Sequence, residues 1–483
     1  MNRLASKTIF QITTALGLVS ICAGFDDALA NNISNAEAQT EVAESQSTAI
    51  SYEPLLVERT NSPIGVGLAV VIVDGDDQNF VTTGFASKDT SKQIDKDSLF
   101  EIGSITKTFT TIILADMVIK GEVSLDDPAA KYLPENVSMP SYDGPDGEGR
   151  EITLKDLATH SSSLPALPDN ISPADPLNPY VDYTSDLLYA FLSNHKLTKP
   201  IGSEVAYSNL AMGLLGHILE LRSGLSYEQL VTQRILKPLN MHNTYMTIPD
   251  DQKPYFVVGH DAAGDSIKHW DFDALAGAGA LRSNIKDMTH YLKANMGLIE
   301  TPLAQAMALS HKIQRSFDGS SNFIGLGWIT QKTDAQNMVW HNGGTYGFRS
   351  FLGFDPERKR GVVVLANSQD NPDLIGSAIL AKKPELLAIA EPNSELSFTA
   401  EQLEKYVGEY QLAPTFSINV SSNGSQLFIQ ATGQSKVAIY AKSKLEFFLE
   451  VVKASIIFEE NDEGEITSLI LDQGGIKRPA KKL

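Results

Sequence analysis

Residues 99–120 read LFEIGSITKTFTTIILADMVIK, and this stretch decides the fold expected around it. Beyond Gly103 the apolar residues recur on nearly all sides of a helix, and helices of that kind are buried. Gly121 follows as a helix stop signal. The stretch therefore predicts a buried helix over residues 107–120, with Ser104 at its start.

Ser104 and Lys107 form a Ser-x-x-Lys pair at the start of this helix. Positions three apart share one helix face, so the hydroxyl and the amine are expected to lie side by side. A serine needs a nearby base to become a nucleophile, and burial lowers the pKa of a lysine enough to make it one. The pair therefore predicts a nucleophile, with an ordinary helix cap at Ser104 as the alternative.

Two further copies of the pattern occur, at Ser193 with Lys196 and at Ser283 with Lys286. Ser193 lies in a polar stretch that favours a loop, and Ser283 is typical of an N-cap before a helix over residues 285–296. Ser104 differs from both because it follows an apolar segment and opens a buried helix.

A second and a third motif lie further along the chain. In Tyr207-Ser208-Asn209, the phenol is suited to relay a proton and the amide to orient a substrate amide. In residues 340–347 (WHNGGTYG), a predicted strand ends in a glycine-rich turn, where the N–H of Gly344 is suited to bind an oxyanion. The alternatives are a plain helix start, a plain hairpin and a structural hydrogen bond from His341.

Strand patterns open and close the region that holds these motifs. Residues 65–73 (GVGLAVVIV) and 80–85 predict a hairpin, and residues 326–330, 338–341, 350–354 and 361–366 predict further strands. Helices are predicted between them, over residues 210–221, 227–236 and 285–296. This order predicts an α+β fold, with a mostly antiparallel sheet built from both ends of the domain and an inserted helical lobe.

The two ends of the chain differ from this central region. Residues 1–30 have a basic start, an apolar run and a final Ala28-Leu29-Ala30, which predicts a secretory signal peptide and export to the periplasm, with a membrane anchor as the alternative. Residues 31–52 favour a disordered linker. We expect a hydrolase domain over residues 53–383, a connector over 384–397 and a small all-β barrel or sandwich over 398–483.

Composition excludes several classes of function. The net charge of −20 argues against a nucleic acid partner. Cys22 is the sole cysteine and would leave with the signal, so the mature chain has no disulfide and no cysteine nucleophile or metal ligand. No zinc-hydrolase motif, P-loop or Gly-x-Ser-x-Gly elbow is present, and we expect no metal and no cofactor.

Together, the three motifs resemble the serine hydrolase family of class C β-lactamases, DD-peptidases, D-aminopeptidases and related esterases. The resemblance runs from about residue 65 to residue 367 and includes residues 157–165, 237–241 and 277–283. It implies the class C β-lactamase fold, with a structural role for His160. Residues 398–483 resemble the lipocalin-like module often appended to these hydrolases.

By this resemblance, Ser104 attacks a carbonyl group while Lys107 and Tyr207 manage its proton, and which of those two is the base stays open. The oxyanion is held by the N–H groups of Ser104 and Gly344. The resemblance implies substrate binding by Asn209, His341, Gly343 and Gly344. The implied substrate is a small molecule or a peptidoglycan peptide, cleaved at an amide or ester bond.

One departure concerns the substrate. Family members active on β-lactams usually carry Lys-Thr-Gly where this chain has His341-Asn342-Gly343. A histidine is mostly neutral near pH 7 and binds a carboxylate less firmly than a lysine does. This favours a D-amino-acid peptidase, an esterase or a weak β-lactamase, with a non-catalytic receptor for penicillin or peptidoglycan as the rival. Arg349 is interpreted as a solvated strand residue or as a compensating charge.

Overall fold

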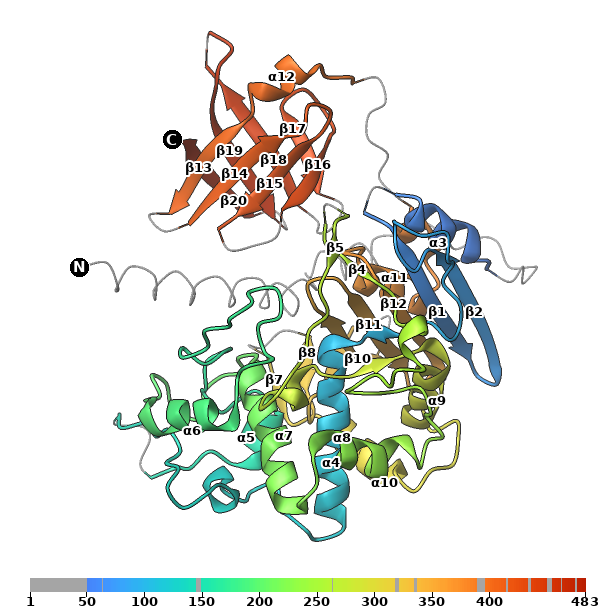
Figure 1. Cartoon of the computed structure of the whole chain (residues 1–483), viewed down its shortest axis with the longest axis vertical. Helices are drawn as coiled ribbons and strands as arrows, with labels where there is room; N and C mark the ends of the chain where they lie inside the picture. Colours follow the sequence, from blue (N-terminus) through green and yellow to red (C-terminus); the bar gives the residue numbers. More distant parts are fainter. Residues whose placement is uncertain are drawn as a thin grey trace.

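A computed structural model of the chain (Figure 1) describes residues 50–62, 64–144, 149–262, 264–317, 321–333, 337–388, 396–413, 416–432, 436–449, 454–461, 463–473 and 476–483. The predicted signal peptide and residues 31–49 of the predicted linker lie outside these ranges. Residues 50–52 lead directly into α3 (Glu53–Thr60), and Tyr52 is buried. No helix within the described ranges is long and apolar enough to span a membrane.

An eight-stranded antiparallel sheet forms the centre of the larger domain. β1 pairs with β12 along its length, from Leu68 opposite Ala366 to Asp74 opposite Arg360, so strands from both ends of the domain lie side by side in one sheet. This confirms the predicted architecture. Across the sheet the strands are β2 (Asp77–Gly84), β1 (Gly67–Asp74), β12 (Arg360–Ala366), β11 (Arg349–Asp355), β10 (Asn337–Gly344), β9 (Ile329–Lys332), β8 (Asn322–Ile324) and β7 (Arg315–Ser316).

Helices cover both faces of this sheet (Figure 1). Alternate residues of a strand point to opposite faces, and in β1 both sets are apolar and buried. Val71 and its neighbours on one face belong to the core that includes α4 (Thr106–Ile119) and α9 (Ile285–Asn295). Val70 and its neighbours on the other face belong to a core with α3 and α11 (Pro372–Leu380).

The predicted buried helix is α4, in which every residue from Thr106 to Met117 is buried. It is buried on all sides because it packs against one face of the sheet and against the helical lobe. The other helices of the domain are α5 (Leu154–Ala158), α6 (Ser185–Asn194), α7 (Asn209–Ser223), α8 (Tyr227–Val231) with a π-helical turn at Thr232–Leu236, and α10 (Ala304–His311).

Three local predictions were wrong. Ser193 lies in α6 rather than in a loop. The N-cap of α9 is Asn284, whose side chain accepts from the N–H of Asp287, while Ser283 lies in a short strand. The strand predicted from residue 326 begins at Ile329, because Gly327 adopts a φ of +71° and turns the chain.

Short elements complete the domain. β3 (Phe100–Glu101) pairs with β6 (Arg282–Ser283), and β4 (Gly259–His260) pairs with β5 (Ser266–Ile267). Turns of 3₁₀ helix lie at Gly103–Ile105, Ala129–Tyr132, Lys253–Tyr255, Ala276–Ala278 and Pro384–Leu387. The β3–β6 pair matters for the site because it leads into the turn at Gly103–Ile105.

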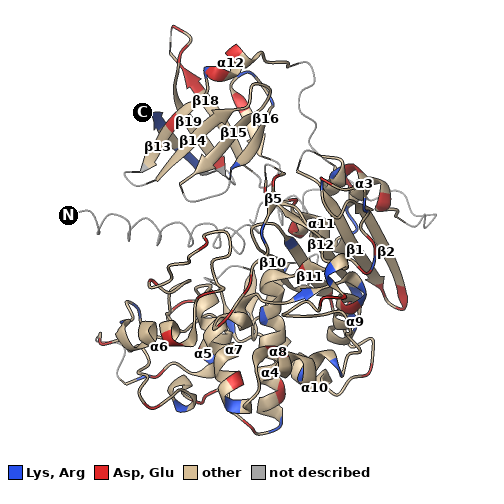
Figure 2. Cartoon of the chain, in the orientation of Figure 1, with Lys and Arg blue, Asp and Glu red and all other residues tan. Residues whose placement is uncertain are grey.

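The C-terminal strands form a closed barrel, which decides between the predicted barrel and sandwich. Its strands are β13 (Gly408–Ala413), β14 (Phe416–Ser422), β15 (Leu427–Ala431), β16 (Val437–Ala441), β17 (Glu446–Leu449), β18 (Ala454–Glu460), β19 (Ile466–Gln473) and β20 (Ile476–Lys482), preceded by α12 (Ala400–Glu404). Aromatic and aliphatic side chains fill the interior. In a chain of net charge −20, β20 is basic, with Lys477, Arg478, Lys481 and Lys482 near the C-terminus (Figure 2).

Candidate active site

Ser104 lies in the 3₁₀ turn just before α4, and Lys107 lies in the first turn of that helix. Lys107 is fully buried, and its Nζ donates hydrogen bonds to Ser104 Oγ at 2.8 Å and to the carbonyl oxygen of Ala278 at 2.7 Å. Gly103 has a φ of +49°, which a glycine adopts without strain and which turns the chain sharply before the serine. The spacing of the first motif thus brings the amine against the hydroxyl.

Tyr207 and Asn209 flank the N-cap of α7. Ser208 has an extended backbone, and its Oγ accepts from the N–H of Ala211 at 2.9 Å, so the helix begins at Asn209. Lys107 Nζ lies 4.9 Å from the centre of the Tyr207 ring. Asn209 lines the same cavity as Ser104. The cap therefore places the two residues on the two sides of one turn, with the Tyr207 ring beside Lys107 and Asn209 at the cavity.

β10 ends at Gly343 and Gly344, beside the turn that carries Ser104. A Cβ on Gly103 would lie 2.6 Å from the backbone nitrogen of Gly344, and a Cβ on Gly343 would overlap the carbonyl oxygen of Ile102. The absence of these side chains lets the two backbones touch. As a result, Gly344 borders the same cavity as Ser104.

Two buried histidines lie near Tyr207, with ring centres 4.6 Å away for His160 and 6.4 Å away for His341. Burial and the charge of Lys107 lower the pKa of His341 to about 3 and lower the pKa of His160 well below its usual value. His341 Nδ1 donates to the carbonyl oxygen of Asn342 at 2.6 Å. His341 is therefore neutral near pH 7 and brings no positive charge to the third motif.

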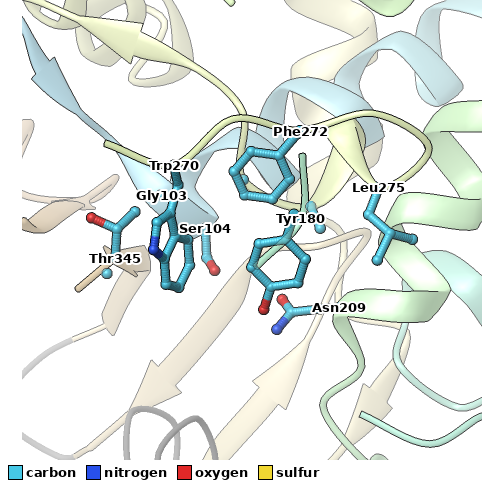
Figure 3. Close-up of a pocket in the computed structure, with 11 residues that line it drawn as sticks. Gly103, Ser104, Tyr180, Asn209, Trp270, Phe272, Leu275 and Thr345 are labelled. Atoms are coloured by element: carbon cyan, nitrogen blue, oxygen red, sulfur yellow. The ribbon is translucent and has the colours of Figure 1, made fainter. Parts of the chain in front are cut away.

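Ser104 borders a small cavity whose walls include three aromatic rings (Figure 3). Tyr180 stacks on Phe272 with ring centres 4.9 Å apart and meets Trp270 edge-on at 5.1 Å. Figure 3 shows these rings together beside Ser104 and Asn209. The site is thus a polar cluster facing an apolar wall, which suits a substrate with an apolar group beside its reactive carbonyl.

A buried ion pair between Glu101 and Arg282 holds the loop that carries Trp270 and Phe272. The backbone N–H of Trp270 donates to Glu101 Oε1 at 2.8 Å, and Arg282 lies 3.8 Å from the same carboxylate oxygen. Arg282 also contacts the carbonyl oxygen of Trp270. The sequence patterns do not predict this wall. The one signal for it is the pair Trp270 and Phe272, shortly before residues 277–283.

The structure brings the predicted site residues together. Ser104, Asn209 and Gly344 line the cavity, and the neighbours of these three within the cluster are Lys107, Tyr207, His341 and Gly343. The other two Ser-x-x-Lys copies lie elsewhere: Ser193 Oγ accepts from the N–H of Ser138, and Ser283 Oγ contacts Thr244 Oγ1. In the described part of the chain, no three His, Cys, Asp or Glu side chains are grouped to hold a metal ion.

Comparisons with known proteins show which family the chain belongs to. The family model described as Beta-lactamase matches residues 61–383, and the one described as Domain of unknown function (DUF3471) matches residues 394–479. A Beta-lactamase from Pseudomonas fluorescens is 27% identical over 353 residues, which cover 66% of this chain and 91% of that protein. The D-alanyl-D-alanine-carboxypeptidase/endopeptidase AmpH of Escherichia coli (strain K12) is 29% identical over 312 residues, covering 62% of this chain and 78% of that protein.

The fold is similar as well. The crystal structure of a Beta-lactamase/D-alanine Carboxypeptidase from Yersinia pestis, complexed with citrate, superposes with a TM-score of 0.60 at 26% identity, covering 71% of this chain and 100% of that one. A class C beta lactamase from Rhodobacter sphaeroides superposes with a TM-score of 0.57. The chain therefore belongs to the beta-lactamase family and is a hydrolase of the beta-lactamase and DD-carboxypeptidase type, with a class C beta-lactamase-like fold.

Proposed function

We propose that this chain is an exported serine hydrolase that forms an acyl-enzyme on Ser104 and cleaves amide or ester bonds in substrates of the penicillin or D-alanyl-peptide type. The 2.8 Å hydrogen bond between Lys107 Nζ and Ser104 Oγ carries the proposal. Burial disfavours the charged form of an amine, so a fully buried lysine in this position is suited to accept the serine proton.

In the acylation step, Ser104 Oγ bonds to the substrate carbonyl carbon while its proton passes to the pair formed by Lys107 and Tyr207. The carbonyl electron pair moves onto the oxygen, which accepts from the N–H groups of Ser104 and Gly344. Collapse of this intermediate expels the leaving nitrogen or oxygen, which takes the proton from the pair. Water then attacks the ester and gives a proton to the pair. The pair passes this proton to Ser104 Oγ as the ester bond breaks, which releases the acid and restores the serine hydroxyl. Lys107 Nζ lies 4.9 Å from the centre of the Tyr207 ring, so the role of the base is assigned to the pair.

His341 favours one part of this substrate range. The pKa of His341 is lowered to about 3, so the ring is neutral, and its one N–H, on Nδ1, is donated to the carbonyl oxygen of Asn342. Its Nε2 is then an acceptor, which offers a substrate carboxylate neither a charge nor a hydrogen bond. We therefore expect slow turnover of β-lactams and faster turnover of esters or D-amino-acid amides. An esterase or a D-aminopeptidase is thus the second candidate function.

Labelling with a fluorescent fluorophosphonate and a fluorescent penicillin tests the proposal. We expect the wild type to react and Ser104→Ala to remain unlabelled. Ser193→Ala is the matched control, because it removes the serine of a second Ser-x-x-Lys copy and should label normally. Label retained in Ser104→Ala would refute the role of Ser104. A penicillin adduct that never turns over would favour a receptor over an enzyme.

The export part of the proposal needs its own measurement. Expression of the full chain in a Gram-negative host, followed by fractionation and N-terminal sequencing, should yield a periplasmic protein that starts at Asn31. A cytoplasmic protein that keeps residues 1–30 would show that these residues do not act as a signal peptide.

A further inference from the structure

The strand end that carries Gly344 has a second set of contacts, on the sheet face opposite to His341. Arg349 of β11 is the register partner of Gly344, and a Cβ on that glycine would overlap Nη1 of Arg349. The guanidinium therefore lies directly over the glycine, in space that any other residue would fill. Arg349 is half-buried, so its interpretation as a solvated strand residue is wrong.

Asp373 approaches the same strand end from the first turn of α11. Its Oδ2 accepts a hydrogen bond from Asn342 Nδ2 at 2.7 Å. The carbonyl oxygen of Asn342 accepts in turn from His341 Nδ1 at 2.6 Å. Asn342 thus links α11 to the third motif, one residue before the two glycines.

The two charged groups attract each other, and both are half-buried. Burial lowers the pKa of Arg349 and raises the pKa of Asp373 to about 7, while the attraction between them opposes each shift. Removing charged groups from water costs more than filling the same space with apolar side chains. The proposed mechanism assigns neither group a role. Both contact the end of β10, Arg349 at Gly344 and Asp373 at Asn342, so their cost points to a function at Gly344.

We propose that Arg349 and Asp373 are positioning residues for the oxyanion site, which hold the end of β10 in place and set a positive charge behind the Gly344 amide. This inference rests on the proposed function, in which that amide receives the oxyanion. The negative charge on the substrate oxygen develops only during the reaction. A cation behind the amide therefore stabilises the transition state more than the bound substrate.

The first test is the separation of kcat from KM for hydrolysis of a p-nitrophenyl ester. In Arg349→Met we expect kcat to fall by roughly 10- to 100-fold while KM stays within about threefold, a smaller loss than for a direct oxyanion donor. Arg349→Lys should recover most of the rate. Arg358→Met is the matched control, because Arg358 is an exposed arginine paired with Asp355 in the next turn, and it should behave as wild type.

Variants at Asp373 and Gly344 test the geometry. Asp373→Asn keeps an acceptor for Asn342 and should retain most of the rate, whereas Asp373→Ala should lose it. In Gly344→Ala the new methyl group displaces the guanidinium, so combining it with Arg349→Met should cost less than the two single losses together. If Arg349→Met does not fold, the two Asp373 variants decide the same question.

The outcomes separate the two proposals. An ester hydrolysis that survives Ser104→Ala refutes the proposed function itself. If ester hydrolysis by the wild type depends on Ser104, but Arg349→Met and Asp373→Ala hydrolyse the ester at the wild-type rate, only this inference is overturned. A rise in KM at constant kcat would also overturn it, because it would make Arg349 a substrate-binding residue instead.

Discussion

The C-terminal barrel and the pocket of the hydrolase domain both contain buried tyrosines. In the barrel, buried polar groups bond to the backbone, whereas in the pocket they contact one another. In the barrel, the Tyr410 hydroxyl donates to the carbonyl oxygen of Tyr406 at 2.7 Å, and the Tyr406 hydroxyl donates to that of Lys444 at 2.6 Å. These bonds tie side chains to backbone inside an apolar core. In the pocket, a fully buried Lys107 contacts a serine hydroxyl and a tyrosine ring.

The buried polar groups of the barrel are therefore expected to contribute to stability, and those of the pocket to catalysis. Satisfied polar groups in the barrel support its packing, so their removal should lower stability. A buried amine in the pocket costs desolvation energy that its contacts offset only in part, so its removal should lower activity and leave stability intact or higher. The comparison predicts opposite outcomes for truncations in the two regions.

The largest effect is expected for Lys107→Met, which replaces the buried amine with an apolar side chain of similar length. Activity should fall by roughly 10⁴-fold, whereas the free energy of unfolding in urea should stay equal or rise. Lys120→Met, which removes an exposed lysine paired with Asp116 after the same helix, is the control and should keep full activity. If Lys107→Met kept near wild-type activity, the buried amine would not be needed for catalysis and the comparison would be wrong.

Phe447→Ala tests the other side of the comparison. Phe447 is buried in the barrel core, and its loss should destabilise the barrel by about 3–5 kcal/mol. Ester hydrolysis at 25 °C should be unchanged. All three tryptophans lie in the hydrolase domain. Their fluorescence therefore reports the unfolding of that domain, whereas circular dichroism reports the unfolding of both domains.

The neighbouring Phe448 offers a matched control on the same strand. Its side chain points to the other face of β17 and is only half-buried, so Phe448→Ala should cost much less stability. Equal losses at both positions would mean that the barrel interior does not depend on close packing.

The sequence predicts the features that follow from local pattern. The apolar periodicity of residues 107–120 predicts α4, and the apolar run at residues 65–73 predicts the strand β1, because each depends on burial alone. The choice of Ser104 over Ser193 and Ser283 also follows from local surroundings. The Ser283 cap was wrong by one residue, since Asn284 is an equally good cap and only the backbone decides between them.

Other features depend on pairing between distant segments and leave no local pattern. The place of Arg349 over Gly344 follows from the register of β10 with β11. The link from Asn342 to Asp373 joins residues on a strand and a helix that lie apart in sequence. The raised pKa of Asp373 follows from burial created by that packing, which no composition or spacing reveals.

His341 and Asp373 predict opposite effects of pH on stability. With a pKa of about 3 against the usual 6.5, folded His341 binds fewer protons than the unfolded chain, so its contribution is present above pH 6.5 and lost as the pH falls toward 3. With a pKa of about 7 against 3.8, folded Asp373 binds more protons than the unfolded chain. Its contribution is therefore present below pH 3.8 and lost as the pH rises through 7.

Urea denaturation at pH 4, 5.5 and 8 measures this difference in Asp373→Asn. Relative to wild type, the variant should gain stability as the pH rises from 4 to 7, by up to about 1.4 kcal/mol for each pH unit. Asp251→Asn, at an exposed aspartate, should show no such trend. A constant difference between Asp373→Asn and wild type at all three pH values would show that Asp373 titrates as in the unfolded chain.

The smallest effect is expected at the apolar wall of the pocket, formed by Tyr180, Trp270 and Phe272, where the packing most resembles that of the barrel core. Trp270 packs edge-on against Tyr180 and Tyr346, with ring centres 5.1 and 4.7 Å away, much as aromatic rings pack in the barrel core. If the ring contacts substrate, Trp270→Ala should raise KM roughly 10-fold for a p-nitrophenyl ester of an aromatic acid. The acetate ester, too small to reach the wall, should be unaffected. An equal loss for both esters would make Trp270 a core side chain like Phe447, which merely borders the cavity.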